Sequence, residues 1–513
     1  MRFTMILTVT LAFFAISHEA QADRHLTILF TNDVESAYDP IPAYWRSDVK
    51  RIGGLPQLST LVDEIRATAD HPVFLFDSGD IFTGSLATAT NGRLALDLMT
   101  AMDYDAMAIG NHEFEFPAEV FALEKNRASF PVLAANIFYK GTNHPFSRPH
   151  TIIERGGLRL GVVGIMGKDA ATALIPSHIA GLDVRDPAPY VQASVDAIRG
   201  SVDLVVLLTH MGKTAPMQTD AEIDPAVHRD INADIALAGA VTGVDILLGG
   251  HADAGTEEPV IHPETGTIIM QTYGQATHLG YLSLTVDDTG AVTNCDCRLI
   301  PVDADKYAGD PTLIAKIEAA RALVRAELFT VIGRSETRLN RLYTRESDLG
   351  NLMADMVKKV SGADIGMVHS GGLRKDLPQG DIRFVDIRDI YPFVDDLVVV
   401  DLTGAQLKAV LEQSLTLERG LMQLSGLTIS YRPKNPRYSR LASANLPDGS
   451  PVDDAAIYSV AVPEIIAQGA DLYKTFNAAE NRRSAGAFED ILRDYFSGRT
   501  VTMPKGGRQI IVD

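Results

Sequence analysis

The chain has 513 residues, of which 46% are hydrophobic and 22% charged. This length exceeds what one hydrophobic core supports, so we expect at least two domains, and the composition is that of a globular protein. The formal net charge of −20 argues against a nucleic-acid-binding surface, so an anionic substrate would have to be attracted locally.

The first 22 residues have the pattern of a secretory signal peptide. Arg2 precedes an apolar run over residues 5–16, and Ala20-Gln21-Ala22 fits the small-residue pattern of a cleavage site. The run is too short to span a bilayer, and neither a cysteine near the cleavage point nor an apolar C-terminus offers an anchor. We therefore expect an exported protein of a bacterial periplasm, without a membrane anchor, as a monomer or weak oligomer.

Five apolar runs in the first half of the chain are typical of β-strands, and polar residues follow each of them. The runs are Thr27–Thr31, Val73–Phe76, Ala106–Ile109, Leu204–Leu208 and Asp245–Leu248. Because ligands bind outside the carboxyl ends of the strands in open α/β sheets, we expect the polar side chains that follow to meet at one sheet edge. These side chains belong to Asp33, Glu35, Asp80, Asn111, His210, His251 and Asp253.

These side chains are suited to metal binding. Carboxylates, an amide oxygen and imidazoles together form a ligand set for two divalent ions such as Mn²⁺, Zn²⁺, Co²⁺ or Mg²⁺. Two metal ions about 3.5–4 Å apart can hydrolyse phosphate esters. The alternative is a structural role, in which Asp80 caps the next helix and Glu35 is a solvated loop residue.

Helical periodicity marks three further segments: Pro56–Ala67, Gly92–Met102 and Thr312–Leu328. Pro311 stands directly before the third segment, as expected at the start of a helix. We expect the boundary between two domains near residues 305–335.

Strands are predicted ahead of this boundary at Tyr281–Val286 and within Val292–Val302. The second of these holds the only two cysteines, Cys295 and Cys297. With one residue between them, they are either reduced thiols at a strand edge or a small strained disulfide ring, and the sequence does not decide between the two.

Five short motifs in the first half of the chain resemble those of one protein family. They are Thr31-Asn32-Asp33, Asp77-Ser78-Gly79-Asp80, Gly110-Asn111-His112-Glu113-Phe114, Leu208-Thr209-His210 and Gly249-Gly250-His251. In this order they resemble the 5′-nucleotidase and UDP-sugar hydrolase family of two-domain metallophosphoesterases.

The resemblance implies a chain of two α/β domains after the signal peptide. Residues 23–308 would form a four-layer αββα sandwich of the calcineurin-like metallophosphoesterase type. A linker helix over residues 309–332 would join it to a 5′-nucleotidase-type substrate-binding domain over residues 333–513.

The resemblance also implies roles for the predicted metal ligands. Asp80 would bridge two ions. Asn111, His210 and His251 would bind one ion, and Asp33, Glu35 and Asp253 the other. The family normally has histidine in place of Glu35, and often Gln, Asn or His in place of Asp253, so this site would be unusually acidic.

His112 would stand beside the substrate phosphate and stabilise the transition state. In the family an aspartate three residues further on orients this histidine, and here that position is Glu115. The longer side chain can still accept a hydrogen bond from the imidazole and keep it cationic, with altered geometry.

The second half of the chain carries the implied substrate-binding residues. Arg345 and Arg374 would bind the phosphate, because a guanidinium donates two parallel hydrogen bonds to an oxyanion. The alternative for both arginines is a surface ion pair. Asp471 would bind ribose hydroxyls, and His369 stands where the family often has Asn.

The predicted base-binding site is incomplete. Family nucleotidases hold the base between two aromatic rings, and Phe393 matches the first ring, whereas Ile465 stands in place of the second. Tyr473 or Phe476 are the candidates to compensate. Loss of one ring is expected to lower base affinity, because stacking contributes roughly 1–3 kcal/mol per base.

The sequence therefore predicts an exported dinuclear-metal phosphohydrolase that releases phosphate from nucleoside 5′-monophosphates or related nucleotides. Two alternatives stay open. One is a nucleotide-sugar pyrophosphatase or 2′,3′-cyclic phosphodiesterase. The other is a non-catalytic nucleotide-binding protein, which the departures at Glu35, Glu115, His369 and Ile465 favour and the retained histidines oppose.

Overall fold

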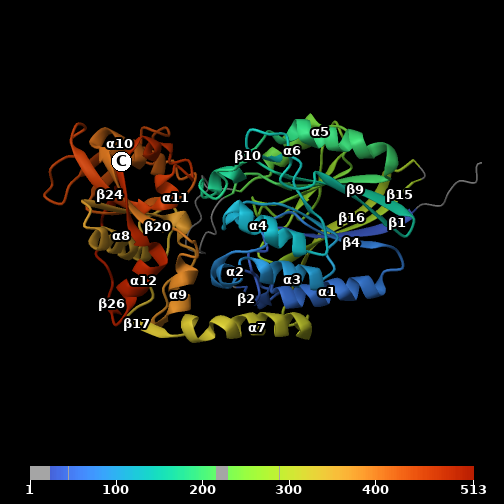
Figure 1. Ribbon diagram of the computed structural model, residues 1–513, viewed down its shortest axis with the longest axis horizontal. Coiled ribbons are helices and arrows are strands. Elements are labelled where there is room, and N and C mark those ends of the chain that lie inside the picture. Colours follow the sequence, from blue (N-terminus) through green and yellow to red (C-terminus); the bar gives the residue numbers. More distant parts are fainter. Residues whose placement is uncertain (1–23, 44, 215–228, 288) are drawn as a thin grey trace, which may run out of the picture.

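The computed structural model describes residues 24–43, 45–214, 229–287 and 289–513, so the signal peptide predicted over residues 1–22 lies outside the described residues. Two α/β lobes lie side by side, and helix α7 (Pro311–Leu328) runs along the N-terminal lobe towards the C-terminal one (Figure 1). The predicted two-domain α/β fold is thereby confirmed. Within the described ranges, we find no helix that is both long and apolar enough to cross a bilayer.

The N-terminal lobe is built on two six-stranded sheets. The order of the first sheet is β16 (Val292–Pro301), β15 (His278–Val286), β1 (Arg24–Thr31), β4 (Val73–Asp77), β5 (Ala106–Ala108) and β6 (Val132–Leu133). The order of the second is β13 (Val260–Ile261), β14 (Ile268–Gln271), β12 (Ile246–Gly249), β11 (Leu204–His210), β9 (Leu158–Met166) and β8 (His150–Arg155).

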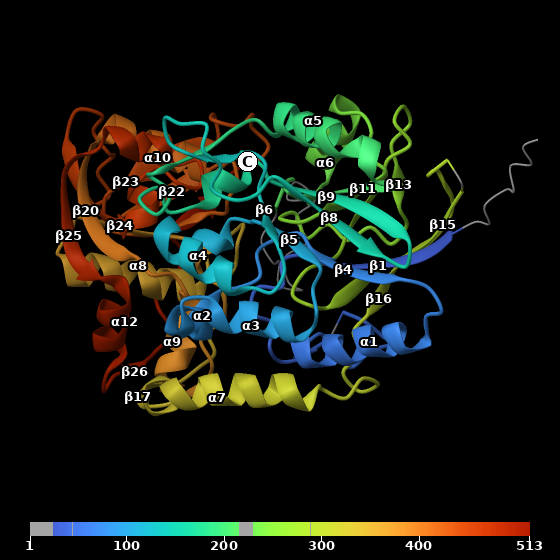
Figure 2. The ribbon, with the colours of Figure 1, turned by 45° about the vertical axis from the view of Figure 1, so that its right-hand side comes forward.

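Side chains along each strand point alternately to the facing sheet and to the outer helices, which gives four layers: helices, sheet, sheet and helices. In β1, Ile28 packs with residues of the second sheet such as Val206, whereas its neighbour Leu29 packs with the helices on the outer face. The first sheet is covered by α1 (Leu55–Thr68), α2 (Gly84–Thr90) and α3 (Arg93–Ala101), and the second by α5 (Pro187–Ile198) and α6 (Asn232–Ala240). Figure 2 shows α5 and α6 on one side of the sheets and α1 and α3 on the other.

All five strands predicted to carry the polar residues are present, but they do not belong to one sheet. Strands β1, β4 and β5 are parallel neighbours in the first sheet, and β11 and β12 are parallel neighbours in the second. The expectation of a single sheet edge is therefore wrong. Strands buried on both faces have continuous apolar runs whichever sheet they join, so the sequence pattern does not assign the sheet.

Helix α7 begins where the sequence predicts it. The Asp310 carboxylate accepts hydrogen bonds from the backbone N–H groups of Thr312 and Leu313, and Pro311 occupies the first turn. The apolar side chains of Leu313 and Ile317 pack into the core of the N-terminal lobe. The helix is thus anchored on one lobe and leads directly into the other.

The C-terminal lobe has a five-stranded sheet at its centre. Its order is β21 (Met422–Ser425), β18 (Ile365–His369), β24 (Ile457–Pro463), β20 (Asp396–Thr403) and β25 (Glu480–Ala487). One core cluster joins this sheet to α8 (Asp348–Ser361), α9 (Phe384–Ile390) and α12 (Phe488–Phe496), and another joins it to α10 (Gly404–Ser414) and α11 (Glu464–Ala467). Two small sheets complete the lobe: β19 (Gly380–Arg383), β17 (Val331–Ser335) and β26 (Thr500–Val501), and β23 (Leu441–Asn445), β22 (Thr428–Tyr431) and β27 (Gln509–Ile511).

The two cysteines lie on β16, the edge strand of the first sheet. The structure joins Cys295 and Cys297 by a disulfide. Their side chains pack against the core between the two sheets, opposite Leu284 and Leu282 of β15.

Candidate active site

The backbone at five of the seven predicted metal ligands adopts a conformation that is rare outside glycine. Positive φ angles occur at Asp33 (50°), Glu35 (46°), Asp80 (59°), His251 (71°) and Asp253 (50°). Such residues cost on the order of 1–3 kcal/mol each and cluster at functional sites, where neighbouring contacts hold them in place. Two of these contacts join the loops after β1 and β4, since Asp33 N–H donates to the Gly79 carbonyl and Glu35 N–H to the Asp80 carbonyl, both at 2.9 Å.

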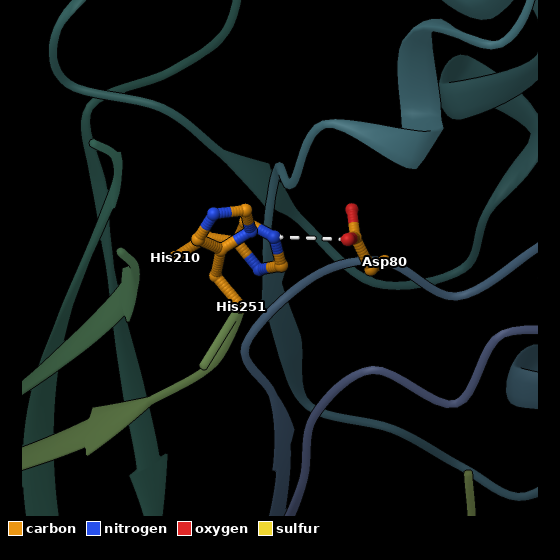
Figure 3. Close-up of side chains that lie close together, drawn as sticks. All are labelled: Asp80, His210 and His251. Atoms are coloured by element: carbon orange, nitrogen blue, oxygen red, sulfur yellow. Dashed lines mark ion pairs between the residues drawn. The ribbon is translucent and has the colours of Figure 1, made fainter. Parts of the chain in front are cut away.

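Asp80, His210 and His251 form the centre of the site (Figure 3). One possible ligand atom from each lies within 4.8 Å of the others, and all three side chains are buried. His210 Nδ1 lies 2.8 Å from the Ser78 carbonyl oxygen, to which it can donate, and Nε2 lies 3.0 Å from Asp80 Oδ2. A backbone carbonyl on one ring nitrogen leaves the other free to bind a metal ion.

The other predicted ligands surround this centre. Asn111 Oδ1 lies 3.2 Å from His210 Nε2. The carboxylate of Asp33 accepts the backbone N–H of His251 at 2.8 Å, which ties β1 of the first sheet to β12 of the second. Asp253 lines the same cavity. The structure therefore brings residues from both sheets together at the carboxyl ends of their strands.

The arrangement fits divalent cations. Among the described residues, His251 Nε2 and Asp253 Oδ1 are buried polar atoms without a hydrogen-bond partner, and such atoms are uncommon unless they have a ligand. The local charge is also strongly negative. Although burial opposes a charge on His210, the carboxylates of Asp80 and Asp33 raise the pKa of this imidazole to about 10. Burial and the neighbouring His210 instead lower the pKa of His251 well below its usual value, so the carboxylates favour positive charge at His210 and not at His251.

His112 lies beside this centre, at the start of the turn after β5. Its backbone N–H donates to Asp80 Oδ1 at 2.6 Å, and its Nδ1 lies 2.6 Å from Glu115 Oε1. The Thr83 hydroxyl donates to the same Glu115 oxygen at 2.6 Å. Burial lowers the pKa of His112, but Asp80, Glu115 and Glu35 outweigh it and raise this pKa well above its usual value. Glu115 thus makes the contact with the imidazole that was expected of it, and the surrounding carboxylates favour the protonated form of His112.

Glu35 reaches the site but makes contacts other than those of the predicted metal ligand. Its Oε1 lies 3.0 Å from Arg374 Nη2 and 3.3 Å from His112 Nε2, and its Oε2 accepts from Gln275 Nε2 at 3.3 Å. It is not part of the three-residue group around Asp80. The Glu35 carboxylate thus contacts both Arg374 of the C-terminal lobe and His112 of the N-terminal lobe.

Glu113 belongs to the site, although its sequence motif predicts no role for it. Its side chain is completely buried, and its two oxygens accept the backbone N–H groups of Asp80 (3.0 Å), Ile81 (2.9 Å) and Gly110 (2.5 Å). It therefore joins the loop that carries Asp80 to the loop that carries Asn111 and His112. Its place directly after Asn111-His112 in the motif was the available signal.

A cavity of about 140 Å³ extends from these residues to the C-terminal lobe. Arg374, Phe393, His369 and Asp471 line it, as predicted from the sequence. His369 Nδ1 lies 3.5 Å from Asp471 Oδ2. The cavity is therefore shared between the two lobes, with the predicted metal ligands at one end.

Arg345 is not among the residues that line this cavity, so the structure does not support its predicted contact with phosphate. The residue is exposed just before Ser347, the capping residue of α8, and within the described part of the chain only its backbone carbonyl is bound, by Gln423. Arg341 and Arg419 line the cavity instead. Arg341 lies four residues earlier in the same non-helical segment, and no motif distinguished Arg419.

Phe393 and Ile465 both line the cavity, as expected from the sequence, and the rings of Tyr343 and Tyr391 line it as well. Tyr473 and Phe476 do not replace the second ring, because both are 2% exposed and belong to the core of the C-terminal lobe. The hydrophobic pattern alone did not separate these core rings from rings at a binding site.

Comparison with known proteins gives two family matches in the same order as the lobes. Residues 26–252 match the calcineurin-like phosphoesterase family, and residues 329–478 match the 5′-nucleotidase C-terminal domain. Helix α7 lies between the two matched ranges.

Related proteins match along nearly the whole chain. A 5′-nucleotidase of Vibrio cholerae is 25% identical over 94% of this chain and 92% of its own length. The trifunctional nucleotide phosphoesterase YfkN of Bacillus subtilis is 27% identical over 90% of this chain, which spans only 33% of that longer protein.

Among solved structures, a 5′-nucleotidase precursor from Thermus thermophilus is similar, with a TM-score of 0.80 and 25% identity over 95% of this chain and 99% of that one. The fold, the order of the two matched regions and the clustered Asp80, His210 and His251 agree with one another. The chain therefore belongs to the 5′-nucleotidase family of two-domain metallophosphoesterases.

Proposed function

We propose that this protein is an exported phosphohydrolase with two divalent metal ions that releases phosphate from nucleoside 5′-monophosphates or related nucleotides. The observation that carries the proposal is one cavity, lined by metal-binding side chains and His112 from one lobe and by Arg374 from the other. Relatives named 5′-nucleotidase that cover most of the chain support the same substrate class.

The proposed metal site divides the side chains between two ions. Asp80 would be shared, with Asn111, His210 and His251 on one ion and Asp33 and Asp253 on the other. Divalent cations bound there would supply a Lewis acid for a phosphoryl oxygen.

The residues of the chain would bind and orient the substrate. The His112 imidazolium, held by Glu115, would hydrogen-bond an oxygen on which negative charge develops, a contribution of typically about 10²–10⁴-fold. Arg374 would bind the phosphate, and Phe393 would stack on the base. Asp471 would bind the sugar. In this division, residues 23–308 bear the metals and residues 333–513 bear most of the substrate contacts, with residues 309–332 as the linker.

A second candidate is a nucleotide diphosphate hydrolase, such as a nucleotide-sugar pyrophosphatase. Arg341 and Arg419 favour it, because they line the cavity in addition to Arg374 and provide positive charge for a second phosphate group. The name of the Bacillus relative, a trifunctional nucleotide phosphoesterase, is consistent with a broader range of phosphoesters.

Phosphate release distinguishes these candidates. The purified protein would be stripped with a chelator, reloaded separately with Mn²⁺, Zn²⁺, Co²⁺ or Mg²⁺, and assayed with a nucleoside 5′-monophosphate, a nucleotide sugar and a 2′,3′-cyclic nucleotide. We expect the monophosphate to react fastest, and the stripped protein and an Asp80→Asn variant to be inactive. Faster reaction of another substrate would favour the second candidate, and no reaction with any metal would favour a non-catalytic binding protein.

Export is tested separately by sequencing the N-terminus of the protein recovered from the periplasm, which we expect to begin near Asp23. A protein that keeps residues 1–22 and stays inside the cell would contradict this part of the proposal.

A further inference from the structure

Glu35 lines the cavity and connects the two lobes there. One carboxylate oxygen, Oε1, lies 3.0 Å from Arg374 Nη2 of the C-terminal lobe and 3.3 Å from His112 Nε2 of the N-terminal lobe. The other oxygen accepts from Gln275 at 3.3 Å. The side chain is only 11% exposed, so both oxygens depend on these contacts rather than on bulk water.

The environment of Glu35 Oε1 is one that a phosphate oxygen would also favour. The Arg374 guanidinium donates to it from one side, and His112 Nε2 lies 3.3 Å away on the other; guanidinium and ring N–H groups both donate to anionic oxygens. Arg374 and His112 are also the two groups that bind phosphate in the proposed function. A carboxylate and a phosphate cannot occupy the same position between them.

The backbone allows the side chain to leave without moving the loop. Glu35 N–H donates to the Asp80 carbonyl at 2.9 Å, and the next residue, Ser36, donates to the Ile81 carbonyl at 3.1 Å. These bonds fix the loop independently of the carboxylate. The position between Arg374 and His112 is therefore occupied by the Glu35 side chain alone and not by the backbone of its loop.

We infer that Glu35 is an internal competitor of the substrate phosphate: its carboxylate pairs with Arg374 and His112 in the substrate-free protein, and the incoming phosphate displaces it. The inference rests on the proposed phosphate-binding role of these two residues. A phosphate dianion carries more charge and more acceptor oxygens than one carboxylate, so it displaces the Glu35 carboxylate. Because the carboxylate must first be displaced, the affinity of the protein for phosphate is lower than it would be without Glu35. Glu35 thereby sets the affinity for substrate and for the phosphate product.

The size of the effect on phosphate affinity follows from the fraction of molecules in which the Glu35 carboxylate occupies the phosphate position. If the carboxylate holds the position in about nine of ten molecules, the apparent dissociation constant for phosphate is weakened about tenfold, because only the remaining fraction is competent to bind. Removal of the negative charge at Glu35 should restore this factor.

The test is direct binding of inorganic phosphate, measured by calorimetry on metal-loaded protein, with the metal content of each sample measured in parallel. Glu35→Gln keeps the shape of the side chain and removes its charge, and Glu35→Ala is a second variant in case the amide disturbs the loop. Asp39→Asn is the matched control, because this exposed carboxylate lies on the same segment, pairs with Arg321 and is not among the residues that line the cavity.

We expect both Glu35 variants to bind phosphate about tenfold more tightly than the wild type with unchanged metal content, and Asp39→Asn to match the wild type. Unchanged or weaker phosphate binding by both variants would overturn the inference, and weaker binding together with a lost metal ion would identify Glu35 as a metal ligand instead. Because binding is measured without turnover, absence of nucleotide hydrolysis would count against the proposed function and leave this result interpretable.

Discussion

Glu113→Gln should weaken metal binding from a position that touches no metal. The Glu113 carboxylate accepts three backbone N–H groups, at 2.5–3.0 Å, from the two loops that carry Asp80 and Asn111. Glutamine keeps one acceptor oxygen, and its amide nitrogen must face at least one of these N–H groups. That buried donor is then left unpaired.

The magnitude follows from these contacts. A hydrogen bond to a charged group contributes about 1.5–3 kcal/mol, and an unpaired buried donor costs a comparable amount. The smallest loss of stability occurs when the glutamine amide nitrogen faces the N–H group of Ile81. The remaining oxygen then still accepts from Asp80 and Gly110, although it no longer carries a charge. We therefore expect a loss of about 2–4 kcal/mol in the free energy of unfolding and, because the loops shift, metal affinity weakened about 10–100-fold.

The assay is titration of the stripped protein with Mn²⁺ or Zn²⁺, together with thermal unfolding of the loaded protein. Glu124→Gln is the control, since Glu124 is also buried and bonded, here to Arg93, but lies in α4 (Ala118–Glu124) away from the cavity. The control should lose stability and keep its metal affinity. Metal affinity that is equal in Glu113→Gln and the wild type would refute the positioning role.

Three further predictions concern other parts of the site and its support. His112→Asn should lower kcat about 10²–10⁴-fold while the metal content measured by mass spectrometry stays constant; loss of metal would instead make His112 a structural residue. Phe393→Ala should raise KM for a nucleoside monophosphate about tenfold, and Ile465→Phe should lower it, since stacking contributes roughly 1–3 kcal/mol; equal KM values would place the base elsewhere. Burial raises the pKa of Asp234 from 3.8 to about 8, so between these pH values the unfolded chain has released a proton that the folded chain keeps, and stability falls as pH rises. Asp234→Asn lacks this dependence. Its free energy of unfolding in urea, relative to that of the wild type, should therefore rise by on the order of 1–3 kcal/mol between pH 4 and pH 8. An equal difference at both pH values would contradict the raised pKa of Asp234.

The sequence predicted the elements of the N-terminal lobe because its strands are long apolar runs that end at metal-binding residues. The five predicted strands and helix α7 are present within one to three residues of their predicted limits. The pairing of strands into two sheets was not predictable, because a strand buried on both faces has the same pattern in either sheet. That is why Asp80 and His210 were expected on one edge and lie instead on two facing sheets.

Site residues on short turns were easier to predict than those that act through long side chains. Asp80, Asn111 and His251 are held by their backbones, and their positions follow from the ends of their strands. Arg345 and Glu35 have long side chains whose direction depends on tertiary neighbours: Arg345 does not line the cavity, and Glu35 lines it but pairs with Arg374. Arg341 and Arg419 are the opposite case: they line the cavity although the sequence did not predict it, because only the packing of the two lobes brings them there.

The most direct test of the account is anomalous X-ray diffraction from crystals of the metal-loaded protein, collected at the absorption edge of the metal. We predict two anomalous peaks on either side of the Asp80 carboxylate, one of them in contact with His210 and His251. Crystals loaded with metal that show no anomalous peak at Asp80 would contradict the proposed metal centre.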